Sequence, residues 1–168
     1  DFWSKVVDVI TKHYPEHKIV MLPQTFNYGT YAGDDINMFK DIEVNRSHSN
    51  LIVVDDQRSS DIQQTIIRNA DAMFGARYHS VVFAINNNVP FVAFNYEHKI
   101  SGLLEELNLK DEMIDIKNLF SSSYFNQHVI DTFDALIPNI HRSPKAQEKA
   151  KAIAKAAFDK FAEKINKV

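Results

Sequence analysis

The sequence predicts an α/β protein, in which a parallel sheet carries helices on both of its faces. Short apolar runs rich in β-branched residues alternate with longer segments whose apolar residues recur at helical spacing. The runs are apolar throughout, as is typical of buried parallel strands. Because 168 residues are enough for one hydrophobic core, we expect residues 1–168 to form a single domain.

Five strands are expected where the apolar runs stop at turn residues. Residues 18–22 stop at Pro23, residues 51–54 stop at Asp55, and residues 72–74 stop at Gly75. Residues 91–94 follow an asparagine-rich turn that closes with Pro90, and residues 113–116 form a short fifth run.

Helices are expected at about residues 2–13, 34–46, 59–69, 80–87, 100–108 and 144–166, with a shorter one at 129–136 after the loop or cap at 121–123. Residues 59–69 are the best supported, because Ser59 or Ser60 can cap a stripe of isoleucines. Residues 81–85 suit a strand as well as a helix. We assign them to a buried helix, because the strands on either side leave no room for two more crossovers.

The composition excludes several classes of protein. The chain has no cysteine, so disulfides and thiolate metal sites are excluded. Its net charge of −3 favours neither a nucleic-acid groove nor a disordered acidic tail. No apolar run approaches the ~18 residues of a membrane-spanning helix, and we expect a cytoplasmic protein. The chain starts without Met in a helical segment, so we expect it to be part of a longer protein.

The charge is unevenly distributed along the chain. From Arg142 onward there are eight basic residues against three acidic ones, a balance of +5, which leaves −8 for the remainder. The segment 144–166 has one apolar face and one lysine-rich face. One interpretation is a helix that packs on its own domain with a solvated lysine face. The other is attraction to a membrane surface that bears anionic lipid.

Polar residues that follow the strands are the candidate site, because ligands of parallel α/β sheets bind at the carboxyl ends of the strands. The third strand is followed by Gly75, Arg77, His79 and Ser80, and we expect Ser80 to cap the next helix with Arg77 and His79 just ahead of it. An arginine suits a carboxylate or phosphate, and a histidine exchanges protons near neutrality. Taken alone, these residues fit a surface ion pair and a solvated histidine better than a functional site.

Other candidate groups have simpler interpretations. His13 and His17 flank Pro15 without a third ligand, so no metal is expected there. Two acidic pairs at 34–35 and 55–56 are interpreted as helix caps and loop residues rather than metal ligands. Three tyrosines on the predicted loops have rings that can stack on a sugar: Tyr28, Tyr31 and Tyr96.

Residues 69–99 resemble the signature region of the polysaccharide pyruvyl transferase family. The order and spacing of its short motifs carry the resemblance, which extends over roughly residues 18–110. The exit of the first strand at residues 23–25, Pro-Gln-Thr, is similar as well. In this sequence the motifs read Ala70-Asp71, Gly75-x-Arg77-x-His79, an apolar helix, Val89-Pro90, a strand and Tyr96-x-x-Lys99.

The resemblance implies a Rossmann-like domain similar to the C-terminal lobe of a GT-B enzyme, whose N-terminal lobe is absent from this chain. The family transfers pyruvate from phosphoenolpyruvate to a sugar of a surface polysaccharide as a ketal, with no metal or cofactor. By similarity Arg77 holds the phosphate or carboxylate of the donor and His79 is the general acid or base. Further substrate-binding residues implied by the resemblance are Lys99, Gln24, Ser80 and Tyr96.

The same resemblance implies a glycan or lipid-linked saccharide as acceptor, at the inner face of the cell membrane, and a chain that is incomplete as an enzyme by itself. Two alternatives stay open. One is the nucleotide-sugar lobe of a GT-B glycosyltransferase, and the other is a non-catalytic lobe of the same fold. Titration with phosphoenolpyruvate and with UDP distinguishes the first alternative from pyruvyl transfer.

Overall fold

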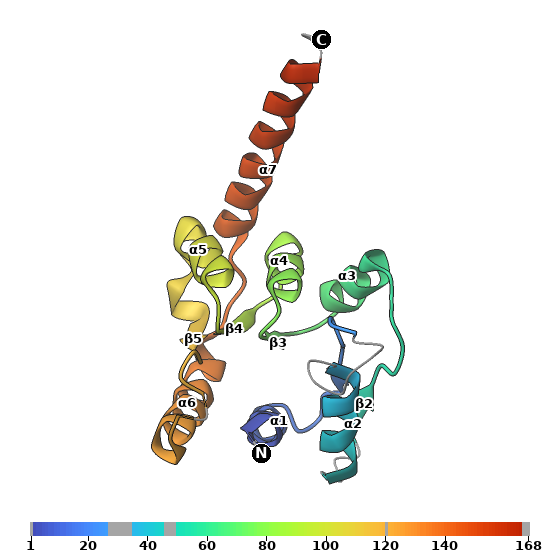
Figure 1. Ribbon diagram of the computed structural model, residues 1–168, viewed down its shortest axis with the longest axis vertical. Coiled ribbons are helices and arrows are strands. Elements are labelled where there is room, and N and C mark those ends of the chain that lie inside the picture. The colour runs from blue at the N-terminus through green and yellow to red at the C-terminus, as the bar shows by residue number, and fades with distance from the viewer. Residues whose placement is uncertain (1, 27–34, 46–49, 120, 166–168) are drawn as a thin grey trace. The chain divides into compact units, whose positions relative to one another are not determined.

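A computed structural model of the protein describes residues 2–26, 35–45, 50–119 and 121–165, and Figure 1 shows its alternating strands and helices. Tyr28 and Tyr31 lie outside the described residues. The strands are β1 (Ile19–Met21), β2 (Leu51–Val53), β3 (Met73–Gly75), β4 (Phe91–Asn95) and β5 (Met113–Asp115). The helices are α1 (Phe2–His13), α2 (Asp35–Asn45), α3 (Ser60–Arg68), α4 (Tyr78–Asn86), α5 (His98–Leu107), α6 (Ser123–Leu136) and α7 (Pro144–Ile165), with 3-10 turns at Lys110–Glu112 and Ile137–Asn139.

The α/β class is confirmed, and all strand pairs are parallel within the part of the chain that the structure describes. The chain divides into two compact units. Unit 1 consists of Asp1–Thr65 and Asn118–Asn139, and unit 2 consists of Ile66–Lys117 and Ile140–Val168. One sheet was expected, whereas the described strands form two, β1-β2 and β3-β4-β5. The single domain over residues 1–168 stays a prediction.

In unit 1 the pair β1-β2 is covered by α1 and α2. Ile19 is in register with Leu51 and Met21 with Val53. Apolar residues of α1 recur at three- and four-residue spacing, and the buried cluster joins Val7, Met21 and Ile42. The helix α6 packs on α1. Ser122 caps α6 by accepting a hydrogen bond from Phe125 N at 3.0 Å, so the helix starts earlier than expected.

In unit 2 the central strand β4 pairs with β3 on one side and β5 on the other. All five residues of β4 are buried, which explains its continuous apolar run. The helices α4 and α5 pack on β4 and on each other (Figure 1). Within α4, Val81, Ala84 and Ile85 are buried, so the assignment of residues 81–85 to a helix is confirmed.

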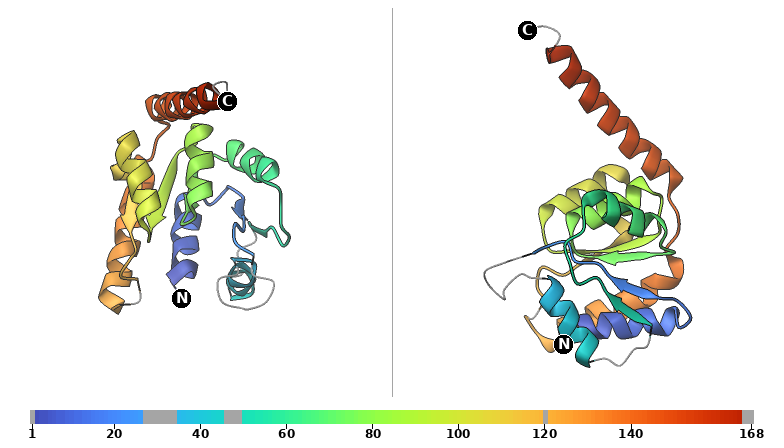
Figure 2. Two further views of the ribbon diagram at one scale, coloured as in Figure 1. Left: turned by 45° about the horizontal axis from the view of Figure 1, so that its top comes forward. Right: turned by 90° about the vertical axis from the view of Figure 1, so that its right-hand side faces the viewer.

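The helix α7 packs on α4 and α5 only through its first turns, and the rest of it extends beyond them (Figure 2). Ala146 is buried, Gln147 Nε2 donates to Asn86 O at 2.6 Å, and Lys149 Nζ donates to Glu106 O. All residues from 151 to 160 are exposed. The expectation that this helix packs on its own domain is therefore wrong for its second half. No helix within the described ranges has both the length and the apolar character needed to span a bilayer.

Candidate functional site

The candidate site of unit 2 lies at the carboxyl ends of β3 and β4, where two helices begin. The strand β3 ends at Gly75 and α4 starts at Tyr78, while β4 ends at Asn95 and α5 starts at His98. The cap residues Arg77 and Glu97 have extended backbones, and neither side chain caps its helix. The first turns of both helices therefore keep backbone N–H groups that no cap side chain occupies, and such groups attract anions.

Gly75 allows the end of β3 to approach α4 closely. A Cβ atom at this position would lie 2.7 Å from Ser80 Oγ and 3.0 Å from Met73 Sδ. Ser80 is buried, and its Oγ donates a hydrogen bond to Arg77 O at 2.7 Å. The expectation that Ser80 caps α4 is therefore wrong, because the helix starts two residues earlier and Ser80 lies in its first turn. Its hydroxyl instead fixes the backbone of Arg77.

Arg77 joins the loop after β3 to the loop after β4. Its Nη1 donates to Tyr96 Oη at 3.3 Å, and Tyr96 is exposed. Two residues predicted from the sequence are thus in direct contact. The guanidinium lies at the start of α4, where the helix dipole and the arginine both favour an anion.

His79 and Lys99 lie in the first turns of α4 and α5, and both are exposed. His79 was expected just ahead of the helix, but it is the second residue of α4. Its ring packs edge-on against that of Tyr78, with 5.9 Å between the ring centroids. The ring of Phe83 also lies nearby, with 6.4 Å between the centroids. These contacts orient the imidazole while leaving it accessible to a substrate.

Gln24 belongs to unit 1, where it follows β1. Its Nε2 donates to Gln63 Oε1 on α3 at 2.6 Å. The buried Asp35 holds the backbone of this loop, because its Oδ2 accepts hydrogen bonds from Gln24 N at 3.0 Å and Thr25 N at 2.9 Å. Asp35 therefore has a structural role, which is to fix the backbone of the loop after β1. Within the described ranges, no three acidic or histidine side chains are grouped as metal ligands.

Asn95 is a candidate that the sequence reasoning missed. It ends β4, it is fully buried, and neither Nδ2 nor Oδ1 of its side chain has a hydrogen-bond partner among the described residues. Side chains alternate along a strand, so Asn95 lies on the same face as Ala93, the register partner of Gly75. That is the face on which Ser80 lies. A polar residue that ends an apolar strand is the signal that could have identified it.

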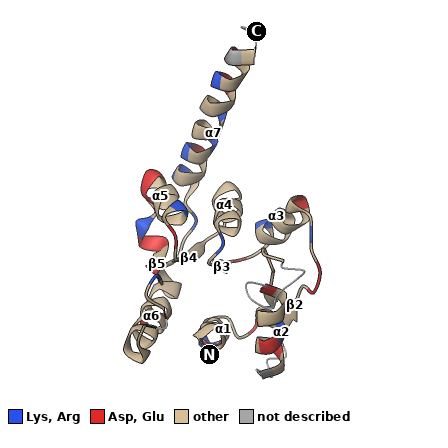
Figure 3. Ribbon diagram, viewed as in Figure 1, with Lys and Arg blue, Asp and Glu red and all other residues tan. Residues whose placement is uncertain are grey.

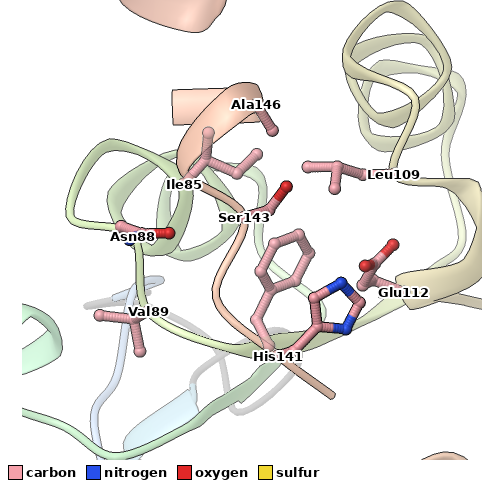
Figure 4. Close-up of a pocket in the computed structure, with 9 residues that line it drawn as sticks. Ile85, Asn88, Val89, Leu109, Glu112, His141, Ser143 and Ala146 are labelled. Carbon is pink, nitrogen blue, oxygen red and sulfur yellow. The ribbon is translucent and has the colours of Figure 1, made fainter. Parts of the chain in front are cut away.

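A small cavity of unit 2 lies at the other end of β4 (Figure 4). Its volume is about 10 Å³, which is room for about one water molecule. The buried Glu112 and the exposed His141 line it together with Asn88. Burial raises the pKa of the Glu112 carboxyl, and the nearby His141 opposes that shift. The cavity is too small for a donor substrate, and it lies near the start of β4 rather than its carboxyl end.

The chain is similar to a family of known proteins. Residues 1–98 match the family described as polysaccharide pyruvyl transferase, which is more than half of the chain. The protein therefore belongs to the polysaccharide pyruvyl transferase family. The match includes Arg77, His79, Ser80 and Tyr96, and it ends one residue before Lys99.

A curated relative is the amylovoran biosynthesis protein AmsJ of Erwinia amylovora, which is 31% identical over 71 residues. The aligned segment covers 41% of this chain and 17% of AmsJ. No solved structure matches the chain.

Proposed function

We propose that this chain is the donor-binding lobe of a polysaccharide pyruvyl transferase, which transfers pyruvate from phosphoenolpyruvate to a sugar as a ketal. Membership of the family supports a transferase of polysaccharide synthesis. The observation that carries the donor assignment lies in unit 2, at the carboxyl ends of β3 and β4. There, Arg77 and Lys99 lie at the starts of two helices whose N-cap residues make no side-chain capping hydrogen bond.

The proposed roles follow from the chemistry of the side chains. The Arg77 guanidinium binds the phosphate or carboxylate as a planar fork, and Tyr96 orients it through the hydrogen bond to its Oη. Lys99 supplies a second cation at the start of α5. In this proposal Ser80 acts by holding the backbone of Arg77 through its hydroxyl. The role of Gln24, which lies in unit 1, stays a prediction.

The reaction needs a proton donor and a cation but no redox step. The methylene carbon of phosphoenolpyruvate gains a proton, two sugar hydroxyls form C–O bonds to the adjacent carbon, and the C–O bond to phosphate breaks. The two sugar hydroxyls lose two protons in total. One proton is matched by the proton that the methylene carbon gains, and the other is taken up by the departing phosphate. His79 is the proposed general acid, because histidine is the residue most often used for proton transfer and this imidazole is exposed.

The acceptor in this proposal is a glycan or a lipid-linked saccharide at the inner face of the cell membrane, in the cytoplasm. A further N-terminal lobe would bind it and complete the enzyme. No metal or cofactor takes part in the proposed reaction, and phosphoenolpyruvate is the substrate that unit 2 binds.

Titration with phosphoenolpyruvate tests the donor assignment. We expect Arg77→Ala to weaken binding by about 10- to 100-fold, the loss typical of a charge-assisted hydrogen bond. Arg58→Ala is the control, because Arg58 is an exposed arginine of unit 1 that pairs with Asp56 at 2.7 Å, whereas Arg77 is half-buried in unit 2. Equal binding by wild type and Arg77→Ala, or tighter binding of UDP than of phosphoenolpyruvate, would contradict the proposal.

Turnover in the complete enzyme tests the role of His79. We expect His79→Ala to lower turnover by about 100- to 10,000-fold while donor binding changes little. His128→Ala is the control, since His128 is an exposed histidine of α6 in unit 1. Unchanged turnover in the His79 variant would remove it from the mechanism.

A further inference from the structure

The second half of α7 exposes a stripe of large apolar side chains. Ile153 is 40% exposed, Phe161 60%, Phe158 69% and Ile165 56%. Exposed apolar residues that stand singly are ordinary, but a contiguous stripe marks an interaction surface. We define the stripe by the residues Ile153, Ala154, Ala157, Phe158, Phe161 and Ile165, which occupy an arc of about 140° at 3.6 residues per turn.

Basic residues recur along α7 (Figure 3), and helix geometry gives their positions around the stripe. By the same helix geometry, Lys160 flanks one border of the stripe and Lys151 flanks the other, with Lys155 next to it. The position of Lys164 falls within the arc, close to the border that Lys160 flanks. Asp159 and Glu163 lie in the middle of the opposite face. Lys155 Nζ bonds Asp159 Oδ2 at 2.7 Å, and both side chains remain largely exposed.

This order of residues fits a lipid surface that bears negative charge. The aromatic rings can enter the boundary between headgroups and acyl chains, while lysines at the borders extend their ammonium groups to lipid phosphates. The two acids in the middle of the polar face then point to water. Each lysine near an anionic membrane contributes about 1 kcal/mol, or about fivefold in affinity.

A second copy of the chain fits the stripe less well. Both borders of the stripe are basic, so pairing two copies through it would set lysines against lysines. We therefore propose that residues 151–165 of α7 lie in the interface of a membrane that carries anionic lipid. The inference rests on α7 alone and is independent of pyruvyl transfer.

Co-sedimentation of the 168-residue chain with vesicles tests this proposal. One set of vesicles contains phosphatidylcholine alone, and the other an equal mixture of phosphatidylcholine and phosphatidylglycerol. At about 0.1 M salt we expect at least about tenfold tighter binding to the anionic vesicles, and weaker binding as salt rises. Absence of binding to the anionic vesicles at low salt would overturn the proposal, as would equal binding to both sets.

Two pairs of variants separate α7 from the rest of the surface. Phe158→Asp with Phe161→Asp should weaken binding by more than about tenfold, because each ring loses its burial in the membrane. Val44→Asp with Tyr124→Asp is the matched control, since these side chains are 80% and 82% exposed on α2 and α6. Equal losses in both pairs would contradict the proposal.

Charge reversal gives a second test that does not touch the apolar stripe. Lys151→Glu with Lys160→Glu should weaken binding by more than about tenfold. Lys18→Glu with Lys40→Glu makes the same charge change at exposed sites of unit 1 and should have a much smaller effect. Circular dichroism checks that all variants stay folded. A concentration-dependent dimer that the phenylalanine variant abolishes, without vesicle binding, would assign the stripe to a second copy and overturn the membrane proposal.

Discussion

Ser80 illustrates how a polar residue in the candidate site can serve the protein rather than the ligand. Its hydroxyl donates to Arg77 O, and the absence of a side chain at Gly75 provides the room for it. The position of Arg77 therefore depends on two small neighbours. Because Arg77 is the proposed anion-binding residue, changes at either neighbour should affect the site through its backbone.

A double-mutant cycle tests this dependence. We expect Gly75→Ala to destabilise the protein by about 1–3 kcal/mol, because the new Cβ atom would meet Ser80 Oγ at 2.7 Å. In a Ser80→Ala background the same change should cost less, since the Cβ atom of residue 80 is 3.6 Å away, an ordinary contact. Urea unfolding of the four proteins measures the coupling. Strictly additive effects would show that the two residues do not compete for this space.

Asn95 should display opposite effects on stability and binding. Its buried amide has no partner, which costs about 1–3 kcal/mol in a protein interior. Asn95→Leu keeps the branched shape and should raise the free energy of unfolding, while weakening phosphoenolpyruvate binding if the amide serves the donor. Calorimetric titration and urea unfolding measure the two effects. A destabilised variant with unchanged binding would indicate that the amide has a partner within the protein.

At the scale of elements, the apolar pattern predicts most of the structure because burial determines it. Each expected strand is present, and the helix at residues 81–85 is confirmed by its buried residues. Starts of helices are harder to predict. Arg77 caps α4 without a side-chain hydrogen bond, so the sequence carries no capping signal there, and Ser80 offers a false one.

The candidate site was predicted only in part, because some of its features depend on contacts between distant parts of the chain. Arg77 and Tyr96 are far apart in sequence, and a shared sheet edge brings them into contact. Asn95 was missed, because its burial and its lack of partners depend on packing that no local pattern encodes. The exposure of α7 could not be decided from the sequence, since an amphipathic sequence has the same period whether or not its apolar face is covered.

The contact between α1 and α6 should make the stability of unit 1 depend on pH. Asp134 of α6 accepts a hydrogen bond from Lys12 Nζ at 2.7 Å and pairs with His13 Nε2 at 2.6 Å. The hydrogen bond from Lys12, followed by that from His13, lowers the pKa of Asp134 below its ordinary value of 3.8. The pKa of Asp134 is lower in the folded protein than in the unfolded chain. The stabilisation is therefore fully present above the unfolded-state pKa of about 3.8, and it is lost as pH falls through the folded-state pKa.

Asp134→Asn should therefore lower the unfolding midpoint at neutral pH, and the difference from wild type should shrink below about pH 4. Thermal unfolding across a pH series measures it. Asp159→Asn is the control, because its pair with Lys155 lies within one exposed helix and should contribute little at any pH. A difference that is constant from neutral to acid pH would rule out the ion pairs as its cause.

At the scale of the whole molecule, the net charge of −3 is the sum of a basic terminal segment and an acidic remainder. The terminal segment from Arg142 carries +5 and the rest carries −8. The candidate donor site nevertheless lies in the acidic part, where Arg77, Lys99 and two helix starts form a local cationic edge. Net charge therefore predicts neither the anion site nor the basic helix, because each depends on where a few residues lie.

Unit 1 is assembled from two segments of chain, and this has a consequence for synthesis on the ribosome. Roughly 110 residues separate α1 from α6, which at about 5–20 residues per second amounts to about 5–20 s of elongation. During that interval the face of α1 that α6 later covers has emerged without its partner. Residues 66–117 of unit 2 are made in the meantime, so the nascent chain has to keep an early helix available while a later sheet forms.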